Sequence, residues 1–391
     1  MIPERPHIER RVLSALDATP TRIPVVLGGC GSGRTSLLMR LSQLLGDGRS
    51  QYIDAERAVS TPESFLAAVT AASPYAIGDD PTMFRGERRT ARAAFDTLLR
   101  FFSQRGRPEI GDPTFLIDEL LELRTFESFP GLRGVLREFL GALTHSQNRF
   151  VLTSRYVSRT HRLLRDLPER FEVLHLPPLS PAEVINALRA RGVGRDEAER
   201  NDLGRMVHAL ADGRPAYTDA LVTTLASTDG ISSGDPVSAL AALLAPGASL
   251  SRTCRFCYEL RLHRARGYGA LKAILLVLAE EEPLTLTSIA RRLGRTPGST
   301  KDYLSWLEDV DLVTVRQKRY SYGDPLMRLW VRLHCRPMAP DDSDLAREVQ
   351  EYAVARLPFL APAIAVADAS AEAPAHDAPP AQKSWGLIEI D

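Results

Sequence analysis

The sequence predicts an α/β domain with a parallel sheet, then a helical segment, and then a small domain in which helices precede a hairpin. Apolar strand-like runs alternate with helical patterns over residues 1–178, which is typical of strands joined by crossover helices. Only helical patterns follow over residues 179–249, and three helices with a basic hairpin occupy residues 250–336. Residues 337–391 are acidic and then rich in Ala, Pro and Asp, which predicts a disordered tail.

Composition narrows the class of protein. The 391 residues carry no formal net charge, so no global field draws the chain to nucleic acid or membrane, and any such partner must meet a local patch. No apolar run reaches the roughly 18 to 20 residues of a membrane span. The start of the chain lacks the apolar segment of a signal peptide, and four scattered cysteines do not form a disulfide framework. We therefore expect a cytoplasmic protein without membrane contact.

The first strand leads into a glycine-rich turn. In "IPVVLGGCGSGRTSLLMRL", residues 23–41, the spacing of Gly28, Gly33 and Thr35 is that of a phosphate loop (P-loop), with Arg34 where a lysine is usual. Such a loop presents the free N–H groups of a helix N-terminus to phosphates. A glycine turn without a ligand is the alternative. The residues expected to hold the nucleotide are Gly28, Gly29, Cys30, Gly31, Ser32, Gly33, Arg34, Thr35 and Ser36.

Further strands and helices follow in alternation. Leucines on one face predict a helix after the loop, and the next strand is "SQYIDA". The segment "TPESFLAAVTAA" begins with a good N-cap and an early proline, so it predicts a helix, as does "TARAAFDTLLRFFSQRG". The segments "LRGVLREFLGALTHS" and "FEVLHL" predict one more helix and one more strand.

Two strands end in polar residues at the edge where α/β folds bind ligands. In "TFLIDELL", Asp118 is placed to hold Mg²⁺ together with Thr35, and Glu119 to polarise an attacking water. In "RFVLTSR", Arg155 is placed to pair with a γ-phosphate, although a solvated loop arginine is an equal alternative. We therefore assign Glu119, Arg34 and Arg155 as the candidate catalytic residues.

Residues 250–336 have the order of a winged helix. The third helix, about residues 299–309, and the hairpin "LVTVRQKRYSYG" would then face DNA. Basic side chains suited to phosphate contacts cluster here, although packing against a protein is the alternative. The candidate DNA-binding residues are Arg291, Arg292, Arg295, Lys301, Arg316, Lys318 and Arg319.

Other candidates carry less information. Cys254 and Cys257 have C-x-x-C spacing on a predicted helix without a second pair, so a buried, inert pair is the better interpretation than a metal site. Arg124 and Arg133 follow the acidic strand, where an arginine finger is one interpretation and a solvated helix face the better one.

The motifs as a set resemble the AAA+-related signal-transduction ATPases with numerous domains (STAND) and the archaeal-type ATPases close to origin-recognition proteins. The matching segments are "GGCGSGRTS", "FLIDE", "FVLTSR", "LHLPPLSPAEV", "ADGRPAY" and "YSYGDPLMRLWVRLH". The resemblance implies a helical lid after the core and a Gly213-Arg214-Pro215 turn in which Pro215 is at the nucleotide. Arg34 departs from the pattern, and a planar guanidinium in place of a compact ammonium predicts weakened hydrolysis.

These observations predict an ATP-binding switch or ATPase that uses ATP and Mg²⁺ and whose nucleotide state controls a winged helix. Its expected partners are double-stranded DNA, a second copy of the chain or another protein. One alternative is a non-hydrolysing scaffold or signalling regulator whose winged helix binds protein. Another is a sequence-specific transcription regulator with a nucleotide sensor.

Overall fold

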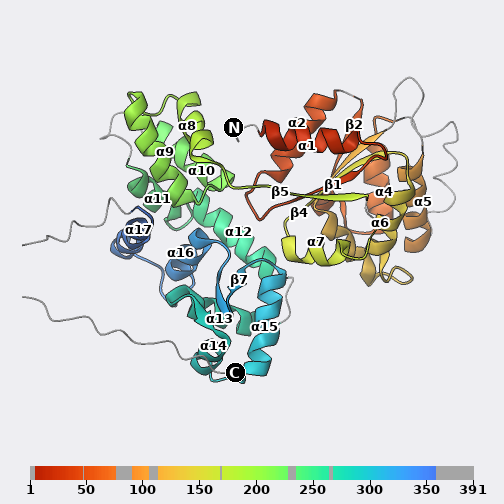
Figure 1. The fold of residues 1–391 in the computed structure, drawn as a ribbon. Helices are drawn as coiled ribbons and strands as arrows, with labels where there is room; N and C mark the ends of the chain where they lie inside the picture. The colour runs from red at the N-terminus through yellow and green to blue at the C-terminus, as the bar shows by residue number, and fades with distance from the viewer. Residues whose placement is uncertain are drawn as a thin grey trace, which may run out of the picture.

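A computed structural model describes residues 5–46, 48–75, 90–104, 113–167, 170–227, 235–263 and 267–357. The core, the helices that follow it and the C-terminal helices and hairpin lie in three groups around helix α12 (Figure 1). Within these described residues, no helix is both long enough and apolar enough to span a bilayer.

A five-stranded parallel sheet forms the core, in the order β2-β3-β4-β1-β5. The strands are β1 (Ile23–Leu27), β2 (Ser50–Asp54), β3 (Thr114–Asp118), β4 (Arg149–Ser154) and β5 (Phe171–His175). All five residues of β1 and of β3 are buried, because helices cover both faces of the sheet. The predicted α/β class with a parallel sheet is confirmed.

The two faces of the sheet have different cores. On one face, Val26 and Leu116 pack with leucines of α1 (Pro6–Leu16) and α2 (Arg34–Leu45). On the other, Phe115 and Phe150 stack with ring centroids 5.5 Å apart and meet phenylalanines of the covering helices. The remaining helical elements of this part are α3 (Ala55–Ala58), α4 (Pro62–Ala71), α5 (Ala91–Ser103), the 3₁₀ helix η2 (Leu120–Ser128), α6 (Val135–His145) and α7 (Val157–Leu164).

Helices alone follow the sheet, as the sequence predicts, and the described residues form one more than the three predicted segments. They are α8 (Pro181–Ala190), α9 (Glu197–Ala211), α10 (Pro215–Ser227) and α11 (Pro236–Leu244). Ser180 and Glu183 form a capping box that fixes the start of α8 directly after the last strand of the sheet. We call these helices the lid.

The C-terminal module, residues 250–336, contains the predicted helices and hairpin. A small antiparallel sheet has the order β6-β8-β7. The elements, which begin just before the module, are α12 (Ser249–His263), α13 (Tyr268–Glu280), β6 (Leu284–Thr285), α14 (Leu286–Arg292), α15 (Pro297–Asp309), β7 (Val313–Arg316), β8 (Arg319–Tyr322) and α16 (Pro325–His334).

The segment predicted to be a disordered tail begins with a helix, α17 (Asp342–Arg356). The side chain of Asp341 caps its first turn, and Leu345, Val349 and Ala353 form a buried stripe at four-residue spacing. The Tyr352 hydroxyl donates to the Leu210 carbonyl of the lid at 2.9 Å. The expectation of a disordered tail from residue 337 is therefore wrong for this helix, and residues 358–391 lie outside the described residues.

Candidate nucleotide site

The glycine-rich turn between β1 and α2 is shaped like a phosphate cradle. Gly31 and Gly33 have φ values of 72° and 90°, a region that favours glycine. A Cβ atom on Gly28 would lie 2.5 Å from the Ser32 hydroxyl oxygen, and one on Gly31 would lie 2.8 Å from the Ala216 Cβ atom. The turn therefore needs glycine at these positions to fold tightly on itself and to lie close to the lid.

Arg34 lies inside this turn, with only 7% of the residue exposed. Its Nη1 atom donates to the Gly28 and Gly29 carbonyls, the latter at 2.6 Å, and to the Ser32 hydroxyl at 3.1 Å. Its Nη2 atom lies 2.5 Å from Glu119 Oε1. The residue at the usual lysine position thus binds the loop's own carbonyls and the acid at the end of β3.

Asp118 and Thr35 meet as the sequence predicts. The Thr35 hydroxyl donates to Asp118 Oδ2 at 2.6 Å. Tyr52 on β2 donates to the same oxygen at 3.1 Å, and Thr153 on β4 donates to Oδ1. Burial, followed by the charge of Asp118, raises the pKa of Tyr52, so this hydroxyl remains a donor. A hydroxyl beside a carboxylate is a suitable oxygen pair for Mg²⁺.

Glu119 lies between two guanidiniums. Its backbone has φ 58°, and its carboxylate pairs with Arg155 Nε at 3.0 Å as well as with Arg34. Burial favours the protonated acid, but the charges of Arg34 and Arg155 outweigh it and lower the pKa of Glu119. Arg155 also pairs with Glu56 and is buried, so the alternative of a solvated loop arginine is wrong.

Two further arginines lie next to Gly29 of the loop. A Cβ atom on this glycine would lie 3.5 Å from Arg214 Nη1 and 3.5 Å from Arg261 Nη2. Arg214 comes from the turn before α10, and Arg261, 3% exposed, comes from α12. The motif "ADGRPAY" gave a signal for Arg214, whereas Arg261 has no local motif.

The lid and the C-terminal module both contact the loop. Ala216, which follows Pro215 at the start of α10, donates its N–H to the Gly31 carbonyl at 3.1 Å. Arg214 Nη2 donates to the Gly323 carbonyl at 2.8 Å, and its Nη1 lies 3.5 Å from Asp324 Oδ2. One turn of the lid therefore joins the phosphate loop to the module.

The cysteines contribute a contact that was not foreseen. Cys254 and Cys257 are buried on α12, as predicted. The Cys257 thiol is also a neighbour of Cys30 in the phosphate loop. The Cys257 thiol and nearby guanidiniums, including that of Arg261, lower the pKa of Cys30 against the effect of burial, whereas the pKa of Cys257 is raised.

The C-terminal module docks on the core through α7. The Asp311 carboxylate accepts the Val157 N–H at 2.6 Å and the Ser158 hydroxyl at 2.8 Å, and it therefore caps a helix of another part of the chain. Arg162 of α7 pairs with Asp309 at the end of α15. These contacts fix the third helix of the module against the sheet domain.

The basic residues predicted to meet DNA are exposed on the module. Arg295 lies over the Tyr303 ring, 5.4 Å from its centroid, and Arg292 pairs with Glu281. Arg124 is an exposed residue paired with Glu127 at 3.2 Å, and Arg133 is exposed. The full exposed set is Arg291, Arg292, Arg295, Lys301, Arg316, Lys318 and Arg319.

No family model matches the sequence. No curated protein matches it either. Among solved structures, the Walker-type ATPase PABY2304 of Pyrococcus abyssi matches with a TM-score of 0.62 and 19% identity over 85% of this chain and 96% of that chain. The Aeropyrum pernix Orc1 protein in complex with DNA matches with a TM-score of 0.45 and 17% identity over 91% and 95%.

A STAND protein with a tetratricopeptide repeat sensor, PH0952 from Pyrococcus horikoshii, matches with a TM-score of 0.37 and 16% identity, over 92% of this chain and 46% of that chain. The strand order, the glycine turn and the similarity to the Pyrococcus abyssi ATPase agree. The chain has the fold of an archaeal-type P-loop ATPase.

Proposed function

We propose that the protein is an ATP-binding switch in which the nucleotide state of the phosphate loop controls the position of the C-terminal module. The observation that carries this proposal is the position of Arg214. Its guanidinium lies beside Gly29 of the loop and binds both Gly323 and Asp324 of the module. A phosphate at the loop would compete with Asp324 for this cation. Phosphate binding at the loop would therefore change the contact between Arg214 and the module.

The residues around the loop fit Mg-ATP. The N–H groups of the turn and of the first residues of α2 would hold the phosphates, while Thr35 and Asp118 would hold Mg²⁺, which neutralises phosphate charge. Two buried side-chain nitrogens, Arg34 Nε and Arg261 Nε, have no hydrogen-bond partner. Buried donors of this kind support an anion as the ligand of this site. Glu119 would orient the attacking water, and Pro215 would place the lid turn at the nucleotide.

Slow turnover follows from the partners of Arg34. To reach a phosphate, this guanidinium must leave the Gly28 and Gly29 carbonyls and its pair with Glu119. Glu119 can polarise water only with a carboxylate that is not held by Arg34 and Arg155. We therefore propose nucleotide binding with slow hydrolysis, which suits a switch better than a motor.

For the module we propose a winged helix that binds double-stranded DNA. Its support is the exposed set of basic residues on α14, α15 and the hairpin, which suits phosphate contacts without base recognition. The alternative, docking of a partner protein on a non-hydrolysing scaffold, has support of its own. Asp309 at the end of α15 and Asp311 just after it already contact α7 of the same chain.

The test is calorimetry of Mg-ATP and Mg-ADP binding with phosphate release followed in the same samples. Wild type, Arg34→Ala and the matched control Arg49→Ala, an exposed arginine that follows α2, are compared. We expect binding and slow release in wild type and the control, and loss of both in Arg34→Ala. Absence of binding in wild type would refute the switch.

The movement of the module needs its own readout. Hydrogen exchange at Val157 and Ser158, whose N–H groups bind Asp311, is measured with and without Mg-ATP. We expect ATP to change exchange at these two amides and ADP to change it less. Equal exchange in all three samples would favour the scaffold.

A further inference from the structure

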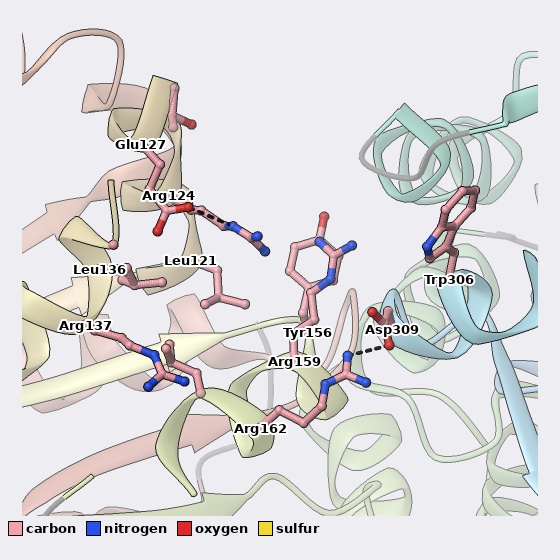
Figure 2. A pocket seen from close by; sticks show the side chains of 13 residues that line it. Leu121, Arg124, Glu127, Leu136, Arg137, Tyr156, Arg159, Arg162, Trp306 and Asp309 are labelled. Carbon is pink, nitrogen blue, oxygen red and sulfur yellow. Dashed lines mark hydrogen bonds and ion pairs between the residues drawn. The ribbon is translucent and has the colours of Figure 1, made fainter. Parts of the chain in front are cut away.

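A cavity lies away from the phosphate loop, between the sheet domain and the C-terminal module. It has a volume of about 850 Å³, which is within the range of small-molecule sites. Figure 2 shows Arg124 and Arg137 on one side, Arg162, Asp309 and Trp306 on the other, and Tyr156 with Arg159 between them. The walls come from η2, α6 and α7 of the core and from α15 of the module.

The lining carries an excess of positive charge. It contains four arginines, of which Arg159 lies over the Tyr156 ring at 5.5 Å. Glu127 and Asp309 are the carboxylates of the lining. They pair with Arg124 and Arg162, whose side chains also line the cavity. Guanidinium forks of this kind match phosphate oxygens in a bidentate way.

The remaining lining suits an aromatic ring. Trp306 is half-buried on the module side and packs edge-on against Tyr303, with ring centroids 5.5 Å apart. This contact fixes the indole without covering it completely. Leu121 and Leu136 add apolar surface on the core side. Bases stack readily on such exposed indole faces.

We propose that this cavity is a second nucleotide site, which takes a nucleoside phosphate with its phosphates against Arg137, Arg159 and Arg162 and its base on Trp306. The observations that carry it are independent of the phosphate loop. Because its walls belong to the core and to the module, a bound ligand bridges them. It therefore stabilises the docked position of α15 on α7 and acts as an input to the module separate from ATP at the loop.

The test counts bound Mg-ADP per chain by equilibrium dialysis on the full chain. Wild type should bind two and Arg34→Ala one. The double variant Arg137→Gln/Arg159→Gln should retain only the loop site, with its cavity affinity lowered about tenfold for each guanidinium removed. Trp306→Leu should weaken the cavity site about tenfold through the loss of stacking. The matched control Arg165→Gln removes an exposed arginine after α7 that does not line the cavity, and it should bind two.

The outcomes separate the two proposals. A single ADP in wild type that survives in Arg137→Gln/Arg159→Gln and disappears in Arg34→Ala overturns the second site and leaves the switch intact. A single ADP that survives in Arg34→Ala and disappears in Arg137→Gln/Arg159→Gln supports the cavity site and refutes binding at the loop. Thermal unfolding of each variant shows whether it is folded, and Trp306→Leu tests the cavity again if the double variant is not.

Discussion

Two groups of cationic side chains differ in their surroundings. The arginines around the phosphate loop are buried, whereas the basic residues of the β7–β8 hairpin are exposed. Arg34, Arg155 and Arg261 are 7%, 5% and 3% exposed, and each binds protein oxygens. Arg316 and Lys318 of the hairpin are exposed. A buried charge must be paired, so changes to the loop arginines and their partners should alter the stability of the fold. The hairpin's cations are exposed and therefore accessible to a partner.

The largest effect in this comparison should come from removing the acid between the buried arginines. Glu119→Ala leaves Arg34 and Arg155 without their shared carboxylate, so we expect the free energy of unfolding to fall by about 3 kcal/mol. Urea denaturation measures it. Glu197→Ala, which removes a carboxylate 57% exposed on the lid, should change it little. An equal loss in both variants would contradict the comparison.

The ion pairs of Glu119 with Arg34 and Arg155 also predict how the stability of the fold depends on pH. The pKa of Glu119 is lowered in the folded chain, so its contribution to stability is complete above the unfolded value of about 4.3 and is lost as the pH falls through the folded value. Wild type should therefore lose stability below about pH 4 more steeply than Glu119→Gln. Parallel curves for the two proteins would show that this carboxylate is not the group responsible.

A smaller effect should follow from restoring lysine at the loop. Arg34→Lys replaces a fork that holds two loop carbonyls and Glu119 with a compact charge that cannot hold all of them. The carboxylate then loses one of the two guanidiniums that hold it, while Arg155 stays in place, and we expect phosphate release to rise about tenfold. A colorimetric phosphate assay at saturating Mg-ATP measures it. Intact binding with unchanged release would show that Arg34 does not limit turnover.

Removing the contact between the C-terminal module and α7 of the core should have a smaller effect still. Asp311→Ala removes the acceptor of the Val157 and Ser158 N–H groups, and the loss of one such cap costs about 1 kcal/mol. Hydrogen exchange at both amides should accelerate without unfolding of the sheet. Asp302→Ala, an exposed position on α15, is the control and should leave the exchange unchanged.

Sequence patterns predicted what depends on local order. The strands β1 and β3 are continuous apolar runs that end in a glycine turn or in acids, so their burial and their shared edge could be predicted. The Thr35–Asp118 contact followed from that edge. The hairpin and the helices before it followed from periodicity in the same way.

Contacts made by side chains that lie outside these strand-end motifs could not be predicted. Arg261 reaches Gly29 only because α12 crosses the loop, and nothing in its helical neighbourhood distinguishes it from other arginines of an arginine-rich chain. Cys257 meets Cys30 for the same reason. The composition of residues 337–391 as a whole predicts disorder and hides the helix α17, in which Leu345, Val349 and Ala353 form a buried stripe.

Substitutions in the hairpin should have the smallest effect on the stability of the fold. They also test most directly whether the exposed cations bind DNA. Arg316→Gln/Arg319→Gln removes two exposed cations, so the midpoint of thermal unfolding should not move. If these residues meet DNA phosphates, the slope of log affinity against log salt should become shallower by about 0.9 for each phosphate that is no longer neutralised. Fluorescence anisotropy with a labelled duplex at several salt concentrations measures this slope, and Arg205→Gln on the lid is the control. A hairpin variant with the wild-type slope would show that these two cations do not neutralise DNA phosphates, and the buried, paired arginines of the loop cannot take their place without first breaking the contacts that hold the loop.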